Sequence, residues 1–141
     1  FKFFKVFQST FAKTLLRELK FTRDYIQLQQ ERFSESALKY LEELEDLESY
    51  QVPPLALQLL VENALKHNRC SDKEPLVLEL IQNKNSLMVR NTLQKRSVES
   101  EHLGIGLSNL VRRYELLKQD NPKVSENSDH FSVSIPLIPS T

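Results

Sequence analysis

The 141-residue chain contains one cysteine, two glycines and no tryptophan. A single cysteine cannot form an internal disulfide or supply a cysteine-rich metal site, so packing must stabilise the fold, as is usual in a reducing compartment. An excess of positive charge is also absent, because 19 basic side chains balance 19 acidic ones. This balance excludes a nucleic-acid-binding domain and a polybasic membrane-surface module.

Long apolar runs are missing as well. A membrane span needs about 18 consecutive apolar residues, and the apolar stretch from Phe1 to Phe11 is interrupted by lysines. The length suits one domain with one core. Because the chain does not begin with methionine, we expect it to be part of a longer protein.

The spacing of apolar residues predicts three helices and a β-hairpin. A long amphipathic helix is predicted over residues 9–33, with charged residues that include Glu18 on its polar faces. A second helix is predicted from Pro54 to His67, since proline is tolerated in the first helical turn, and a third from Leu107 to Gln119. The two strands of the hairpin are predicted on either side of an asparagine-rich turn at residues 83–85.

The end of the chain predicts a second hairpin, in which Val124 to Glu126 pairs with the alternating run from Phe131 to Leu137. The segment from Ser36 to Tyr50 is ambiguous. Its leucines fit a helix, whereas Leu38 and Tyr40 alternate as in a short strand, and periodicity alone favours the helix. The order of elements predicts an α+β protein, a two-layer sandwich with helices on one face of a mixed, mostly antiparallel sheet.

The most informative segment is the helix from Leu59 to Asn68. Asn63 lies one turn after Leu59, at the border of the apolar stripe, where an unpaired amide is costly and therefore needs a partner. Glu62 and Lys66 are four residues apart, so a plain ion pair on the helix surface is an alternative to a functional role.

Two further segments carry weaker signals. A predicted strand ends in Asn91, which by itself is explained as a strand terminator. Both glycines of the chain lie in Gly104-Ile105-Gly106, directly before a predicted helix. A Gly-x-Gly at that place lets backbone N–H groups and the positive end of the helix meet an anion such as phosphate.

In this order and spacing, the segments resemble the ATP-binding domain of LytS-type sensor histidine kinases, within the superfamily that includes gyrase and the heat-shock chaperone ATPases. The resemblance covers about residues 16–137. Its strongest strings are Val61-Glu62-Asn63-Ala64 with Lys66-His67, and Gly104-Ile105-Gly106-Leu107 with Asn109. It implies a strand, rather than a helix, near Leu38 to Glu42.

The resemblance also implies a role for each site residue, with ATP and Mg²⁺ as cofactors. Asn63 would bind Mg²⁺ through its amide oxygen, a hard ligand for a hard cation. Glu62 would polarise the attacking imidazole or accept its proton, and the Asn91 carbonyl would accept a hydrogen bond from the adenine amino group. The remaining implied nucleotide contacts are Lys66, His67, Gly104, Gly106, Leu107, Asn109 and Arg113.

The implied activity is that of a protein-histidine kinase, which transfers the γ-phosphoryl group of Mg-ATP mainly through positioning and charge neutralisation. Residues 1–33 would lead from the phosphoacceptor region into an ATP-binding domain at residues 34–141. None of His67, His102 and His130 stands in an acceptor context, so the acceptor histidine is expected outside this chain.

The resemblance further implies the partners and the location of the parent protein. The expected partners are the phosphoacceptor helix, a response regulator and a second copy of the parent protein, with no nucleic acid among them. The expected location is the cytoplasmic side of a bacterial inner-membrane protein.

Leu93 and Lys95 depart from the superfamily pattern, which has glycines after the adenine-contacting residue. This departure leaves an alternative function, a non-catalytic signalling or dimerisation module of the same fold with impaired nucleotide binding.

Overall fold

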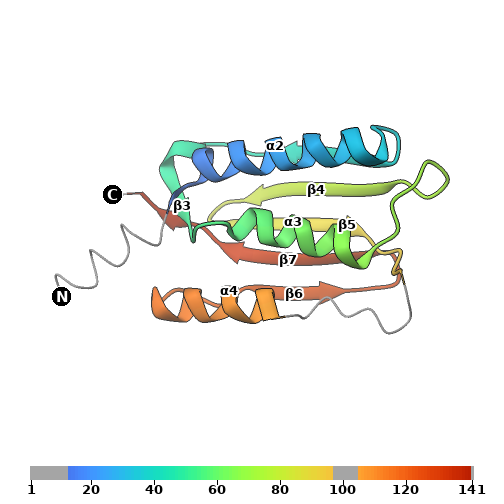
Figure 1. The fold of residues 1–141 in the computed structure, drawn as a ribbon. Helices are drawn as coiled ribbons and strands as arrows, with labels where there is room; N and C mark the ends of the chain where they lie inside the picture. The colour runs from blue at the N-terminus through green and yellow to red at the C-terminus, as the bar shows by residue number, and fades with distance from the viewer. Residues whose placement is uncertain (1–12, 97–104, 141) are drawn as a thin grey trace.

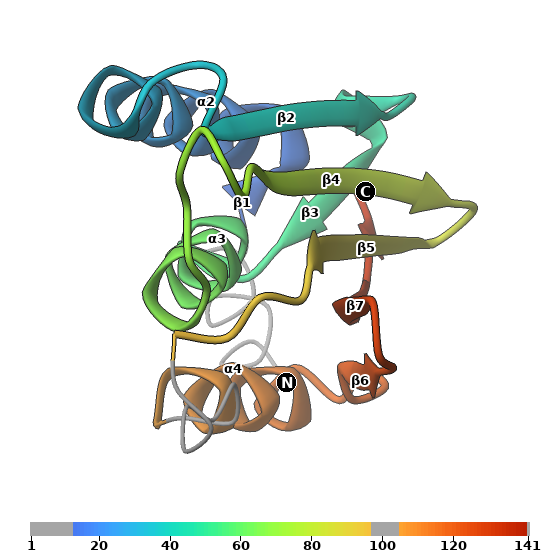
Figure 2. The same ribbon diagram turned by 90° about the vertical axis from the view of Figure 1, so that its right-hand side faces the viewer.

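The computed structural model describes residues 13–96 and 105–140. Three helices cover one face of a five-stranded sheet, which gives the two layers seen in Figure 1 and, end-on, in Figure 2. The helices are α2 (Leu15–Phe33), α3 (Ala56–His67) and α4 (Ile105–Leu116). The predicted two-layer α+β sandwich is confirmed.

The five-stranded sheet has the order β2-β4-β5-β7-β6. Its strands are β2 (Leu38–Glu43), β4 (Leu76–Asn83), β5 (Ser86–Thr92), β7 (His130–Pro136) and β6 (Lys123–Glu126). Only β2 and β4 pair in parallel; the other neighbours are antiparallel. The β4–β5 and β6–β7 hairpins were both predicted and are confirmed.

A small antiparallel sheet contains β1 (Lys13–Thr14), β3 (Tyr50–Val52) and β8 (Ile138–Pro139), and a 3₁₀ turn at Leu47–Ser49 leads into β3. It joins the start and the end of the described chain to the segment before α3. The small sheet therefore holds the loop from which α3 begins.

The core lies between the helices and the sheet. Alternate residues of β4, β5 and β7 point toward the helices, as expected for a sheet with one covered face. The buried strand residues are Leu76, Leu78, Leu80, Leu87, Val89, Phe131, Val133 and Ile135. On the helix side, α3 buries Leu57, Leu60, Val61 and Ala64. Burying a side chain of leucine size contributes about 1.5–3 kcal/mol, so this stripe fixes α3 on the sheet.

The N-terminal helix differs from its prediction in two ways. It begins at Leu15, because Lys13 and Thr14 pair with β3 and the Thr14 hydroxyl caps the helix by accepting the Arg17 N–H at 3.3 Å. Residues 9–12 of the predicted helix lie outside the described residues. Glu18, expected on a polar face, is only 4% exposed because α2 lies against α3.

The helix that periodicity favours over residues 36–50 is wrong. Leu38–Glu43 forms β2, as the family resemblance implies. Leu38 is buried against the helices, whereas Leu41 points to the open face of the sheet and is 55% exposed. The leucine spacing predicted a helix wrongly because Leu41, one of the spaced leucines, is not part of the core.

Among the helices within residues 13–96 and 105–140, none is both long and apolar enough to span a bilayer. The division of the chain at residue 33 stays a prediction.

Candidate functional site

The centre of the candidate site is the side of α3 that faces α4. Leu59 lies on this side, and a Cβ built on Gly106 would lie 3.1 Å from its Cδ1 atom. A side chain at Gly106 would crowd the end of the Leu59 side chain, so glycine lets the start of α4 lie close to α3. Asn63, one turn after Leu59, shares its side of α3. The Asn63 amide is half-buried and makes no hydrogen bond within the described part of the chain.

The backbone brings Arg96 and Gly106 to the same stretch of α3. The chain leaves the sheet region at Arg96, whose N–H donates to the His67 carbonyl at 3.0 Å, and it enters α4 with Gly106 against Leu59. Asn63 lies between these two anchor points, about 6 Å along the helix from each. Gly104 lies outside the described residues.

Asn91 supplies the second polar group. It is 2% exposed and pairs with Leu78 and Phe131, both buried under the helices, so its side chain faces the helical layer. Its Nδ2 donates to the Thr92 carbonyl at 2.8 Å, whereas its Oδ1 accepts no hydrogen bond from the residues described. Leaving a buried acceptor unpaired costs about 1–3 kcal/mol. This oxygen is therefore available to a ligand that brings an N–H donor.

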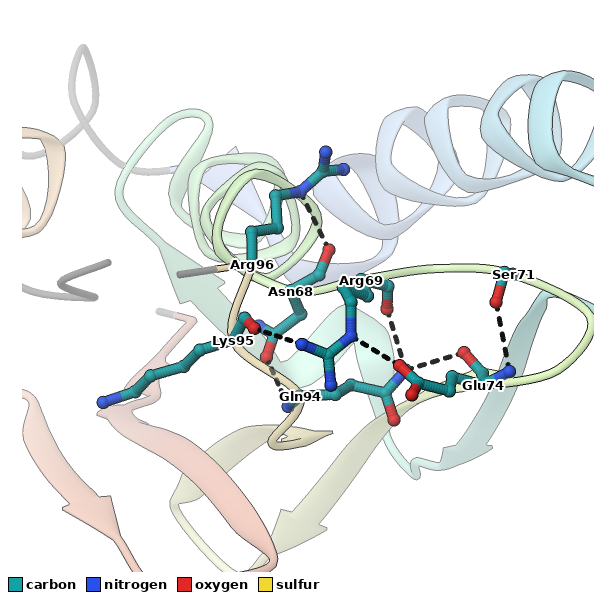
Figure 3. A network of polar contacts seen from close by, with 7 residues as sticks. All are labelled: Asn68, Arg69, Ser71, Glu74, Gln94, Lys95 and Arg96. Carbon is teal, nitrogen blue, oxygen red and sulfur yellow. Dashed lines mark hydrogen bonds and ion pairs between the residues drawn. The ribbon is translucent and has the colours of Figure 1, made fainter. Parts of the chain in front are cut away.

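Asn68 contrasts with Asn91, because both ends of its buried amide are paired. Its Nδ2 donates to the Ala64 carbonyl at 2.8 Å and its Oδ1 accepts the Gln94 N–H at 2.9 Å. Arg96 donates to the Asn68 and Leu65 carbonyls at 3.0 and 3.2 Å. Figure 3 shows this network, which fastens the segment after β5 to the C-terminal end of α3.

The network continues to the loop before β4. Arg69 contacts Glu74 at 2.5 Å, and the Gln94 amide donates to the carbonyls of both residues at 2.8 and 2.7 Å. The sequence analysis assigned no role to Asn68, Gln94 or Arg96. The only sequence signal was the position of Asn68 directly after a helix, where a short polar side chain often bonds the preceding turn.

Leu93 and Lys95, the two departures from the superfamily pattern, both make contacts with other segments. Leu93 packs against the core, and its N–H donates to the Asp129 carbonyl at 2.8 Å. The Lys95 ammonium lies 3.6 Å from a Glu126 carboxylate oxygen, and its carbonyl accepts from Arg69 at 2.8 Å. The Leu93 N–H and the Lys95 side chain thus attach the segment after β5 to the β6–β7 hairpin.

Glu62 and Lys66 both contribute to the part of α3 that borders α2. They line a hollow of about 320 Å³ between α2 and α3, together with Tyr25, Gln29, Arg32, Phe33, Leu65 and Arg96. The Glu62 carboxylate accepts a hydrogen bond from Gln58 at 3.0 Å. Successive residues are separated by about 100° around a helix, so the structure does not bring Glu62 to the Asn63 side.

His67, at the last turn of α3, is half-buried. Burial lowers the pKa of its imidazole, and the positive charge of Lys66 adds to this effect. A lowered pKa favours the neutral imidazole near pH 7.

The other predicted site residues lie on α4. Leu107 is buried and Asn109 is exposed. The Arg113 guanidinium donates to the Pro54 carbonyl, just before α3 begins. Pro54 and Asn63 are separated by about 13 Å along the helix direction, so Arg113 is held at the opposite end of α3 from His67.

Comparisons with known proteins bear on this arrangement. No family model matches the chain. Over 94 residues, 67% of this chain, the sequence is 33% identical to an uncharacterized sensor-like histidine kinase of Staphylococcus epidermidis. The matched region spans 17% of the length of that relative.

Solved structures with a similar fold are also histidine kinases. The cytoplasmic segment of histidine kinase QseC matches with a TM-score of 0.58 at 14% identity, over 92% of this chain and 78% of that one. The catalytic domain of histidine kinase ThkA matches with a TM-score of 0.54 at 10% identity, over 91% and 97% of the two chains. The chain has the fold of a histidine kinase catalytic domain.

A further match is a complex of ThkA with the response regulator protein TrrA, with a TM-score of 0.50 at 15% identity, over 89% of this chain and 41% of that one. The histidine kinase fold supports the family resemblance in its broad form. The LytS subtype and the individual residue roles stay predictions.

Proposed function

We propose that this chain is the ATP-binding catalytic part of a sensor histidine kinase, and that it transfers the γ-phosphoryl group of Mg-ATP to a histidine outside these residues. The observation that carries the proposal is the buried Oδ1 atom of Asn91, which accepts no hydrogen bond from the described part of the chain. An adenine amino group would donate to this oxygen and so remove the cost of burying it unpaired.

Asn63 supports the phosphate end of the same proposal. Its half-buried amide has no protein partner among the described residues, and it lies on α3 between His67, which accepts from the Arg96 N–H, and Leu59, which contacts Gly106. An amide oxygen suits Mg²⁺, which is bound by few protein ligands and keeps waters and phosphate oxygens. Asn63 would hold the ion, and the backbone beside Gly106 would lie along the phosphates.

The role of Glu62 as the group that activates the imidazole remains a prediction. Its carboxylate is bonded to Gln58 on the side of α3 that faces α2. The acceptor helix comes from outside the described residues, so its approach decides whether Glu62 is within reach. Substitution of Glu62 by Gln keeps the Gln58 contact and removes the base. A loss of transfer at unchanged nucleotide affinity would support the role.

We also propose the partners that this function requires: a phosphoacceptor helix, a response regulator, and a second copy of a parent protein anchored in a bacterial inner membrane. The solved complex of ThkA with TrrA supports the response regulator as the partner class. The alternative of a nucleotide-impaired module is not favoured, since Leu93 and Lys95 make contacts that hold the segment after β5 in place.

The test is calorimetric titration of the chain with ATP, with and without Mg²⁺, followed by transfer of labelled phosphate to a supplied acceptor helix. We expect Mg²⁺-dependent binding and transfer in trans, with no labelling of the chain itself. Binding weaker than about millimolar in both titrations would overturn the proposal. Acid-labile label on His67, His102 or His130 would contradict an external acceptor.

A further inference from the structure

The C-terminal end of α3 is capped by a segment that lies far away in the chain. The last carbonyl groups of any helix lack partners within the helix. The Asn68 amide donates to the Ala64 carbonyl, and Arg96 serves two further carbonyls: its Nη2 donates to Leu65 at 3.2 Å and its backbone N–H to His67 at 3.0 Å. The Arg96 Nε donates to the Asn68 carbonyl at 3.0 Å (Figure 3). One arginine thus bonds three carbonyls at the end of α3, where its positive charge is also favourable.

These bonds join the two segments that carry the candidate nucleotide contacts. Asn68 follows Asn63 by five residues, and Arg96 follows Asn91 by five residues. Between Asn91 and Arg96, the Gln94 N–H donates to the Asn68 Oδ1 at 2.9 Å. Asn63 and Asn68 are about 7.5 Å apart along the helix direction, and three extended residues span at most about 10 Å. The spacing between the Asn63 and Asn91 amides therefore depends on two short lengths of chain and on the bonds that connect them.

Packing on the sheet does not fix this spacing by itself. The buried stripe of α3 is apolar, and burial of apolar surface has no directional requirement. Packed helices shift by about 1–2 Å in conformational changes, whereas hydrogen bonds lose their geometry over such a distance. The bonds made by Arg96 therefore restrict the position of α3 along its axis relative to the end of β5.

We propose that Arg96 is a positioning residue for nucleotide binding: by bonding the carbonyls at the end of α3, it holds Asn63 at a fixed spacing from Asn91. A ligand that contacts both amides at once is sensitive to this spacing, because a misplacement of about 1 Å weakens one of its two contacts. This inference rests on the proposed nucleotide-binding function.

The test measures the Kd for ADP, with Mg²⁺ and with EDTA, in matched variants. Arg96→Lys keeps the charge and the backbone N–H but cannot bridge two carbonyls as the guanidinium does, and Arg96→Gln also removes the charge. The control is Arg90→Lys. Arg90 donates to Glu79 through Nε and Nη2 on the face of the sheet away from the helices, and it adjoins Asn91. Because Arg96 is exposed, its substitution leaves the core intact, and the thermal midpoint is recorded on each preparation.

We expect both Arg96 variants to raise the Kd for Mg-ADP about fivefold or more and to leave the Kd in EDTA within about twofold. The Mg²⁺-bound form uses Asn63 as well as Asn91, whereas ADP without Mg²⁺ does not need the metal ligand. Arg90→Lys should leave both Kd values within about twofold. An equal rise in the two Kd values of the Arg96 variants would overturn the positioning role, since it would show damage to the adenine contact. A wild-type Kd in Arg96→Lys with a loss in Arg96→Gln would also overturn it, in favour of a direct contact between the charge and phosphate.

Amide hydrogen exchange tests the same coupling in the unmodified chain. If Mg-ADP prefers the spacing that Arg96 maintains, bound Mg-ADP must stabilise the bond between the Arg96 N–H and the His67 carbonyl, because coupling is reciprocal. Saturating Mg-ADP should therefore slow exchange at Arg96 more than at Leu117, whose N–H bonds the Arg113 carbonyl near the end of α4. Equal slowing at both amides would overturn the coupling. A wild-type chain that binds no ADP in either condition would overturn the proposed function itself, whereas binding that is unaffected in the Arg96 variants would overturn only the positioning role.

Discussion

Two buried asparagines lie at the ends of secondary-structure elements, Asn68 directly after α3 and Asn91 near the end of β5. They differ in how far their side-chain amides are hydrogen-bonded. The Asn68 amide is fully paired, with Nδ2 on Ala64 and Oδ1 on Gln94. Within residues 13–96 and 105–140 the Asn91 amide pairs only its Nδ2, and its buried Oδ1 accepts no hydrogen bond. Buried polar groups are normally satisfied. The unsatisfied amide is therefore the one that we propose contacts a ligand, whereas the satisfied amide stabilises the fold.

The ends and the middle of α3 show the same contrast between paired and unpaired polar groups. The start of α3 is held by the hydrogen bond from Arg113 to the Pro54 carbonyl, and its end is held by the Asn68–Arg96 network. Between them, Asn63 has no hydrogen-bond partner among the described residues. Because contacts at both ends of α3 restrict its movement, the unpaired Asn63 amide is held at a fixed position. A preorganised binding site requires such a fixed polar group.

The largest effect is expected at Asn63. Asn63→Ala should reduce phosphoryl transfer to a supplied acceptor helix by about a hundredfold or more, because it removes the metal ligand. The thermal midpoint should change little, since the residue is half-buried and alanine is a good helix former. Transfer rate and midpoint are measured on one preparation.

Asn63→Asp provides the matched control. It keeps an oxygen ligand but adds a negative charge beside the triphosphate, and like charges about 4 Å apart cost about 4 kcal/mol at an effective dielectric near 20. It should also lose transfer while remaining folded. A lowered midpoint with intact transfer in Asn63→Ala would instead assign this residue to the scaffold.

Asn68→Ala should act on stability. It leaves the buried Gln94 N–H and Ala64 carbonyl without their partners, which costs about 2 kcal/mol and lowers the thermal midpoint by roughly 5–10 °C. Denaturant unfolding checks the value. If Asn68→Ala lowers the thermal midpoint no more than Asn91→Leu does, Asn68 is no more important for stability than Asn91, and the proposed difference between the two residues is contradicted.

Asn91→Leu should act on binding. The apolar side chain replaces an unpaired acceptor, so the free energy of unfolding should stay within about 1 kcal/mol of the wild type or rise. The Kd for ATP should increase about tenfold. Asn91→Asp, which restores the acidic residue usual in the superfamily, should bind nucleotide through the same hydrogen bond. Equal affinity of the Leu variant and the wild type would contradict the adenine contact.

The smallest effect is expected where polar groups are paired but exposed. Arg23 forms two hydrogen bonds with the Glu42 carboxylate at 2.7 and 2.6 Å, and this interaction, ahead of the hydrogen bond from Tyr40, lowers the pKa of Glu42. Exposed pairs contribute about 0–1 kcal/mol. Arg23→Gln should therefore lower the midpoint only slightly at pH 7.

The pH dependence of this pair has a definite sign. The folded pKa of Glu42 lies below the unfolded value of about 4.3, so the stabilisation is present above pH 4.3 and is lost as the pH falls through the folded pKa. The midpoints of Arg23→Gln and the wild type should converge in that acidic range. A difference that persists there would point to packing of the arginine stem.

Much of the fold could be predicted from the sequence. The order of helices and hairpins, the core stripe of α3 and the one-sided sheet follow from periodicity, because the face that a residue takes is a local property of its element. Asn63, Asn91 and the glycine pair were also found, since a polar residue at a core border and paired glycines in a glycine-poor chain are visible in the sequence.

What the sequence did not reveal depended on neighbours distant along the chain. Leucine spacing at residues 36–50 predicted a helix, but pairing with β4 made Leu38–Glu43 a strand. Glu18 was placed on a polar face and Asn68 received no role. Packing of α2 against α3 buries Glu18, and Asn68 bonds the Gln94 N–H, so both depend on contacts that no local pattern predicts.

The sequence by itself determined which segments are helices with an apolar stripe, which are hairpins, and which residue types are unusual where they stand. Only the tertiary structure decided which polar groups are satisfied, because an amide at 0% or 2% exposure is paired or unpaired according to the atoms that packing brings against it. Asn68 and Asn91 have the same chemistry, and their different neighbours leave the first amide fully paired and the second with an oxygen that no described residue satisfies, which is why we propose a ligand there.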